Sequence, residues 1–440
     1  MQAGKTLVQS MLWRGLYYVS AFIINILLAR HFEASVSGSV YYISSIYALV
    51  LLFVSLSLES GIIYFVAKKE IPVERLFNFS LVWALLIGLI SFLTVYFFFK
   101  KEYQGIPSGL MIFSAVLYIS GNLLITYCSG FFYAHNNFKV PNLIIVAGTF
   151  FLIVTLPYGG KSIIPAVNDG NYFYLYFGSF FMQGILMAIG VKIYYIRSFF
   201  LKLLSAAEFR LLLRYCGLAF AANIIFFLLY RIDYFFVEKF CTARELGNYI
   251  QVSKLVHLFF ILPTILAAAV FPITAGGQKV DINKLLTLLS RTIFFIYILA
   301  CLFLGLAGNW LFPFLFGESF TDMYKPFLLL IPGILALSGI FTVTAFFAGT
   351  NRIDLNIKGS VYALVVILTG DLIFIPKYGI AAAALVSSTG YIVYQVYIIA
   401  VFKKEYPCAV SDFFIFRLSD LNQIKKSISN ARKGKHESQQ

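Results

Sequence analysis

Charge is scarce in this 440-residue chain, because only 12% of the residues are Asp, Glu, Lys or Arg while 60% are hydrophobic. A soluble domain of this length needs far more charge to cover its surface, so the composition excludes one. Histidine is also rare, with four residues, and the five cysteines are scattered without a Cys-x-x-Cys pair. No metal-binding spacing is present, and we expect the cysteines to be apolar packing residues.

Signatures of catalysis are missing as well. The sequence contains no G-x-x-x-x-G-K-[ST] phosphate-binding loop, which excludes an ATPase of its own. A glycosyltransferase or polymerase of the cell envelope would carry a long extramembrane loop, and no such segment interrupts the apolar runs. We therefore expect neither an enzyme nor a cofactor. The net charge of +15 does not indicate nucleic acid, because basic residues of a membrane protein gather in its cytoplasmic loops.

Long apolar runs fill most of the chain. About 20 apolar residues cross the hydrocarbon core of a bilayer as a helix. By this criterion the sequence predicts an all-α polytopic membrane protein with twelve transmembrane helices. The spans are expected at 6–29, 38–66, 76–99, 108–133, 140–159, 172–196, 211–237, 247–274, 288–312, 326–348, 355–376 and 380–402.

The distribution of basic residues supports this count and orients the chain. With both termini in the cytoplasm, 23 of the 34 Lys and Arg residues fall on the cytoplasmic side and nine on the outer side. Arg14 and Lys254 lie deeper within their spans and are counted on neither side, whereas basic residues near the ends of spans are counted with the adjoining side. This bias follows the positive-inside rule. After the last span, 405–440 reads as a cytoplasmic amphipathic and basic tail, with an interfacial helix expected at Ser411–Ser429.

Short matches between the two halves indicate an internal repeat. The matched groups are Phe131-Phe132-x3-Asn136 with Phe346-Phe347-x3-Asn351, and Gly38, Ser44 and Leu49 with Gly247, Ser253 and Leu258 at a constant offset. They occur in the same order at corresponding places. We therefore expect two six-helix lobes, 1–200 and 201–404, around a central cavity.

Several motifs resemble those of bacterial polysaccharide flippases. They are Arg231-Ile232-Asp233, Glu245-Leu246-Gly247-Asn248-Tyr249, Phe271-Pro272, Leu315-Phe316-Gly317, and the run from Ile375-Pro376-Lys377-Tyr378-Gly379 to Ala383. The chain is thus similar to the O-antigen and related oligosaccharide flippases of the multidrug/oligosaccharidyl-lipid/polysaccharide exporter superfamily. It departs from their pattern at Ala382, where Gly is frequent, and at Asp371, where Asn is common.

The resemblance implies a function. It implies a flippase of the bacterial inner membrane that moves an undecaprenyl-pyrophosphate-linked oligosaccharide from the cytoplasmic to the outer leaflet by alternating access. Other polysaccharide assembly proteins would be its protein partners. Two relatives within the superfamily stay open as alternatives, a cation-coupled multidrug exporter and a lipid II flippase. A cavity lined by cations would repel a cationic drug, so the sign of the charge distinguishes the exporter from a flippase.

Four residues are candidates for binding the anionic pyrophosphate: Arg14, Lys254, Arg231 and His257. A cation within a span is costly, so it usually faces a cavity or a partner. Lys254 and His257 are three residues apart and share one helical face. The alternatives are that Arg14 and Lys254 extend their stems to the membrane surface, that His257 is a packed residue, and that Arg231 and Asp233 pair with loop groups.

Three acids are candidates for binding a coupling H⁺ or Na⁺: Glu59, Asp371 and Asp233. An ionisable residue inside a transmembrane segment is often part of an ion pathway or a proton relay. Passive downhill flow is equally compatible with the sequence.

Overall fold

A computed structural model of the chain describes residues 2–98, 108–157, 162–164, 167, 171–196, 202–264, 282–350, 352–417 and 419–420. Within these residues the regular structure is entirely helical. In a bilayer a helix satisfies its own backbone hydrogen bonds, which an open strand cannot do. The all-α fold predicted from the apolar runs is confirmed.

Eleven α-helices and two short 3₁₀ helices make up this part of the chain. They are α1 (Gln2–Ser55), α2 (Leu58–Lys68), α3 (Val73–Phe98), α4 (Ser108–Ala134), α5 (Lys139–Thr155), α6 (Tyr172–Tyr195), α7 (Ala206–Phe240), α8 (Ala243–Leu258), α10 (Ile282–Phe316), η1 (Glu318–Met323), α11 (Tyr324–Gly349), α12 (Ile353–Glu405) and η2 (Val410–Phe413).

Eight of these helices are long and apolar enough to cross a membrane, as judged from the described residues. Two of the eight are bent, α1 at Glu33 (φ 59°) and α12 at Gly379 (φ 58°), so each has two arms. The arms, together with the shorter α5 and α8, fall on the twelve predicted spans. The part of the expected 247–274 span after residue 264 lies outside the described residues.

The helices form two compact units. The N-terminal unit comprises Gln2–Phe32 and Ser39–Ile224, and the C-terminal unit comprises Glu33–Gly38 and Ile225–Gln440. The helix α7 therefore contributes its first half to one unit and its second half to the other. The short segment at the bend of α1 belongs to the C-terminal unit.

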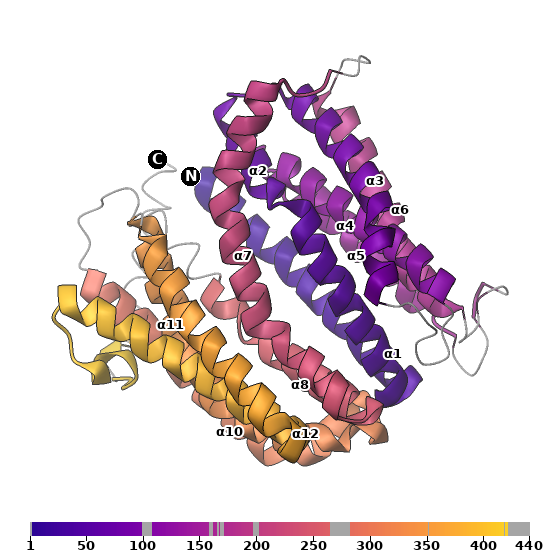
Figure 1. Cartoon of the computed structure of the whole chain (residues 1–440). Helices are drawn as coiled ribbons and strands as arrows, with labels where there is room; N and C mark the ends of the chain where they lie inside the picture. Colours follow the sequence, from indigo (N-terminus) through magenta and orange to yellow (C-terminus); the bar gives the residue numbers. More distant parts are fainter. Residues whose placement is uncertain are drawn as a thin grey trace, which may run out of the picture. The chain divides into compact units, whose positions relative to one another are not determined.

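In the N-terminal unit α4 packs against both α3 and α6 (Figure 1). Buried tyrosines cross-link its helices through backbone carbonyls. The Tyr47 hydroxyl donates to the carbonyl oxygen of Met111 at 2.6 Å, and the Tyr127 hydroxyl donates to that of Ser55 at 3.0 Å. Such bonds satisfy the phenol groups inside an apolar bundle.

In the C-terminal unit α11 lies along both arms of α12 (Figure 1). The bend of α12 follows Pro376 and places Gly379 at a positive φ, which a residue without a Cβ adopts at little cost. Beyond the bend, Ser388 Oγ donates to the carbonyl oxygen of Leu329 on α11 at 2.6 Å. The bend thus folds the second arm back onto α11.

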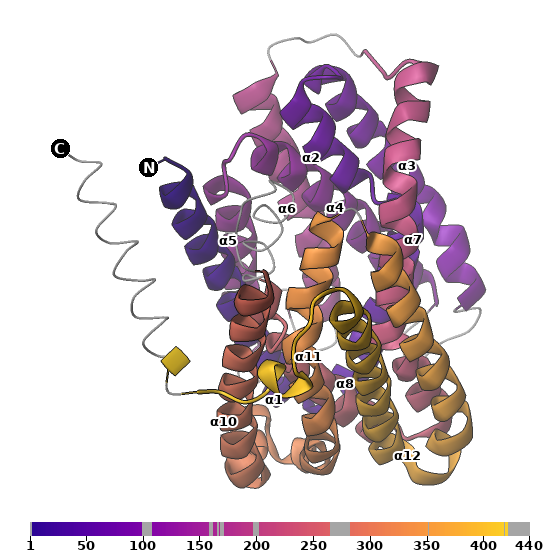
Figure 2. The ribbon, with the colours of Figure 1, turned by 90° about the vertical axis from the view of Figure 1, so that its left-hand side faces the viewer.

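The described part of the tail packs on α10 instead of forming the expected helix from Ser411 (Figure 2). It contains η2, an irregular stretch at 414–417 and two helical residues at 419–420, and the ring of Phe414 lies 5.0 Å from that of Phe294. Asp420 is fully buried and forms an ion pair of 2.5 Å with Arg291 of α10. The prediction of a helix is wrong at 411–417, because aromatic packing and this buried pair hold the backbone in another shape, whereas Ser419 and Asp420 are helical as predicted. The rest of the expected helix, except 419–420, lies outside the described residues.

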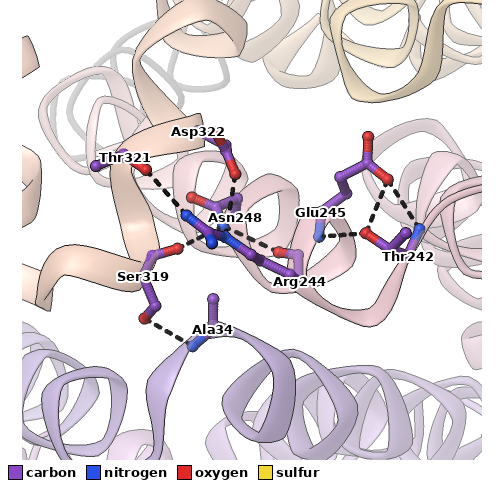
Figure 3. A network of polar contacts seen from close by, with 8 residues as sticks. All are labelled: Ala34, Thr242, Arg244, Glu245, Asn248, Ser319, Thr321 and Asp322. Carbon is purple, nitrogen blue, oxygen red and sulfur yellow. Dashed lines mark hydrogen bonds and ion pairs between the residues drawn. The ribbon is translucent and has the colours of Figure 1, made fainter.

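The bent segment of α1 docks on the start of α8 (Figure 3). The bend at Glu33 takes the backbone N–H of Ala34 out of the helical pattern, and this group donates to Ser319 Oγ of η1 at 3.0 Å. Asn248 Nδ2 of α8 donates to the carbonyl oxygen of Ser319 at 3.0 Å. Arg244 completes the attachment through an ion pair of 3.2 Å with Asp322.

Backbone lies directly against backbone at this junction. A Cβ on Gly247 would lie 1.8 Å from the carbonyl oxygen of Ala34, and one on Gly38 would lie 2.5 Å from Gly247 Cα. Both distances are shorter than any real contact, so the two segments meet only because these positions are glycine.

We expect Gly247→Ala to destabilise the purified protein by about 3 kcal/mol, at the upper end of typical overpacking costs. The methyl group would push the backbone of Ala34 away from α8. The measurement is thermal unfolding in detergent. Gly217→Ala is the control, because a Cβ there meets nothing within 4 Å. An equal melting temperature for the two variants would contradict the close contact.

Candidate functional site

Asp233 of α7 is buried and surrounded by donors from three helices. Its carboxylate accepts a short hydrogen bond from the Tyr249 hydroxyl of α8 and one of 3.1 Å from Ser387 Oγ of α12. The backbone N–H of Tyr234 donates to the other oxygen at 2.9 Å. The alternative that Asp233 pairs with loop groups is therefore wrong, because all three donors lie within helices.

Asp371, on the first arm of α12, is fully buried, and neither of its carboxylate oxygens has a hydrogen-bond partner among the described residues. It interacts electrostatically with Asp233. A buried carboxylate without a partner is costly in its charged form. The two acids that the sequence suggested separately thus belong to one acidic pair, in which one member is satisfied and the other is not.

A basic cluster occupies the same unit as the acidic pair. Lys254 and His257 of α8 both interact electrostatically with Arg231 of α7. Arg231 forms no ion pair with any described acid, and its guanidinium lies 5.3 Å from the ring centre of Phe227. The structure therefore brings together three of the four residues that the sequence suggested for binding the pyrophosphate.

Aromatic rings surround one side of this basic cluster. The His257 ring contacts Tyr230, at 5.9 Å between ring centres, and Phe260, at 5.0 Å, and these two rings also contact each other. Tyr230 in turn contacts Tyr391, and Phe260 contacts Phe341. The Nε2 atom of His257 is buried without a hydrogen-bond partner. Aromatic faces next to cations suit a ligand that joins sugar rings to phosphate.

The other two predicted residues lie in the N-terminal unit. Arg14 is on the first arm of α1, and its side chain lies outside the described residues. Glu59 is in the first turn of α2, directly after a break of the helix at Ser57. Its Oε2 atom is buried without a hydrogen-bond partner. Glu59 is thus a second acid with a buried oxygen that no described residue hydrogen-bonds, and it belongs to the other unit than the acidic pair.

Sequence reasoning missed Tyr249, Ser387 and Tyr230. Tyr249 stands inside a motif that was recognised, but nothing in the sequence tells that it reaches Asp233, sixteen positions away on another helix.

No group of three or more His, Cys, Asp or Glu residues in the described ranges could hold a metal ion. The oxygen atoms around Asp233 and Asp371 are hard ligands of the kind that alkali and alkaline-earth cations prefer.

The long apolar helices define a polytopic membrane protein. Solved structures share this fold. The lipid II flippase MurJ in an inward closed conformation matches with a TM-score of 0.70 and 15% identity, covering 92% of this chain and 89% of that chain. An inward-facing multidrug resistance transporter of the MATE family matches with a TM-score of 0.66 and 14% identity, covering 89% and 96%. A MOP superfamily transporter from Pyrococcus furiosus, described as having a binding pocket of reverse polarity, matches with a TM-score of 0.59 and 14% identity, covering 90% and 92%.

A sequence profile then assigns the family. The profile described as polysaccharide biosynthesis protein matches residues 27–325, more than half of the chain. The chain belongs to this family, and its fold is the flippase-like transporter fold of the MOP superfamily. A comparison with curated proteins finds no match.

The two acids are expected to respond differently to substitution. Asp371→Asn should leave the stability unchanged or raise it, because no hydrogen bond is lost and repulsion by Asp233 is removed. Asp233→Ala should cost about 1–3 kcal/mol, because the buried hydroxyl groups of Tyr249 and Ser387 lose their acceptor. Thermal unfolding in detergent measures both. A large loss of stability in Asp371→Asn would mean that Asp371 has a structural partner.

Proposed function

We propose that the chain is a flippase for an undecaprenyl-pyrophosphate-linked oligosaccharide, which it moves from the cytoplasmic to the outer leaflet of the bacterial inner membrane for surface polysaccharide synthesis. The observation that carries the proposal is the basic cluster of Arg231, Lys254 and His257. Family membership supports the polysaccharide context. The proposal includes no enzymatic step.

The physical argument starts from the pyrophosphate. Its charge needs cations in a place shielded from salt, where Coulomb attraction is several-fold stronger than in water. Arg231 offers a planar fork that fits two phosphate oxygens at once, and Lys254 adds a point charge. Asp233, two residues from Arg231 on the same helix, is held by hydroxyl and amide donors. Arg14 is proposed as a further phosphate contact on the N-terminal side.

Coupling to an ion is part of the proposal. Asp371 is buried without a partner, and a bound Na⁺ or H⁺ would neutralise it. Ser387 and Asp233 offer neighbouring oxygens. Glu59 is the alternative site for the coupling ion, because it also has a buried oxygen without a partner.

A cation-coupled multidrug exporter is the second candidate, favoured by the unpartnered acid at Asp371. The MATE transporters share the fold, and the Pyrococcus furiosus relative is described with a pocket of reverse polarity, so the charge of the site differs within the superfamily. A lipid II flippase has the same fold. If this chain transported lipid II, the anionic headgroup of that lipid would also bind at the basic cluster.

Transport in reconstituted vesicles tests the basic cluster. Lys254→Ala, Arg231→Ala and Arg14→Ala are each expected to slow the translocation of a polyprenyl-pyrophosphate oligosaccharide roughly tenfold, as for the loss of one charge-assisted hydrogen bond. The control is Lys358→Ala, which removes an exposed lysine paired with Asp354. Unchanged transport in all three variants would refute a cationic substrate site. Efflux of a lipophilic cation by the wild type would favour the exporter, and preference for lipid II would favour that substrate.

A second transport experiment tests ion coupling. We expect an imposed Na⁺ or pH gradient to accelerate translocation by the wild type, and Asp371→Asn to abolish the acceleration while basal transport persists. Asp354→Asn, an exposed acid on the same helix, should keep it. Loss of the acceleration in Glu59→Gln but not in Asp371→Asn would move the coupling site to Glu59. No effect of either gradient on the wild type would indicate passive flow.

A further inference from the structure

The N-terminal unit contains an apolar groove that the proposed transport does not use. The groove measures about 530 Å³ and lies between α3, α4 and α6. Its apolar lining consists of Phe77, Leu81, Leu85, Leu124, Phe181, Ile185, Ala188, Ile189 and Ile193. Leu85 and Ile189 keep 44% and 50% of their surface exposed, so the groove is open on its side. This size is in the range of ligand-binding pockets.

The groove runs along α3 and α6. Leu81 and Leu85 lie one turn apart on α3, and Ile185 and Ile189 lie one turn apart on α6, so each helix presents one continuous face to it. At 1.5 Å per residue, the lining from Asn78 to Leu85 spans about 10 Å and that from Phe181 to Ile193 about 18 Å. A space with these proportions and an apolar wall fits a hydrocarbon chain.

One end of the groove is basic and polar. Lys192, in the last turn of α6, and Asn78 of α3 line this end. Asn78 Nδ2 donates to the carbonyl oxygen of Lys202 at 3.2 Å, which brings a second, exposed lysine to the same end. Arg75, one turn before Asn78, is held by Glu208 at 3.0 Å. The two lysines thus lie at the same end of the groove as the paired Arg75.

We propose that this groove binds an anionic phospholipid of the surrounding bilayer, with one acyl chain along α3 and α6 and the phosphate at Lys192. The ligand must be apolar along most of its length and negative at one end, which is the chemistry of such a lipid. Basic pockets between transmembrane helices are known to hold anionic headgroups. The bound lipid would fasten α3 to α6 on the outside of α4. The proposal does not depend on the transported substrate.

Native mass spectrometry of the full chain in detergent tests the proposal. Phosphatidylglycerol and phosphatidylcholine with the same acyl chains are titrated separately. We expect the wild type to retain phosphatidylglycerol preferentially, and Lys192→Gln to reduce its retention about fivefold, the effect of one lysine near an anionic surface. Lys192→Arg should keep the preference. Lys404→Gln, which removes an exposed lysine in the last turn of α12, a helix that does not line the groove, should bind like the wild type.

A second variant tests the apolar part. Ala188→Phe places a ring inside the groove and is expected to displace the acyl chain, which lowers the retention of both lipids. If this variant fails to fold, the comparison of Lys192→Gln with Lys192→Arg still decides. Equal retention of the two lipids by the wild type, or unchanged retention by Lys192→Gln, would overturn the proposal. Preferential retention of a polyprenyl diphosphate over phosphatidylglycerol would also overturn it, by assigning the groove to the transported lipid.

Discussion

A charge inside an apolar helix bundle has to be compensated, and the polar architecture of this protein follows from that constraint. Asp233 is compensated by three donors, and Asp420 by the guanidinium of Arg291. Removing one partner of such a pair leaves the other charge buried and uncompensated, which is far more costly than losing a surface ion pair. Among the buried aspartates of the described residues Asp371 is the exception, because neither of its oxygens has a hydrogen-bond partner there. A fold that satisfies its other buried aspartates so thoroughly keeps this one open at a cost, and a role in ion binding gives a reason for keeping it.

Breaks in the long helices place the polar groups. The bend at Glu33 releases a backbone N–H that then fastens the bent segment to η1. The bend at Gly379 returns the second arm of α12, and with it Ser387, to the side of α7 that carries Asp233. Straight helices of the same composition would cross the membrane equally well. They would not bring these groups from three helices to one point.

The sequence alone indicated the all-α membrane fold, because apolar runs and basic flanks report directly on the bilayer as solvent. The repeat was also informative. Phe132 and Phe347, matched in the repeat, each accept a backbone hydrogen bond from the residue five positions on, at 2.9 Å from Asn137 and 2.7 Å from Arg352. The two matched residues thus accept the same type of backbone hydrogen bond at the C-terminal ends of α4 and α11.

The partners of the site were not predictable, because they depend on tertiary packing. Tyr249 and Ser387 look like ordinary membrane-helix residues until α7, α8 and α12 are placed together. The docking of the tail was missed for the same reason. Its apolar spacing suits a helix on a membrane surface, but Phe413 is fully buried within the protein and Asp420 meets Arg291. Periodicity predicts which face is apolar and does not say what covers it.

The junction of Gly38 and Gly247 has an evolutionary consequence. It consists of main-chain atoms alone, so it contains no group that titrates or can be oxidised. Acidity and ionic strength, which weaken the neighbouring exposed pair of Arg244 and Asp322, leave it unaffected. Every substitution at these two positions adds atoms and none removes them. Any substitution at either position therefore adds a side chain to a contact that has no room for one, and no conservative replacement by a smaller residue exists.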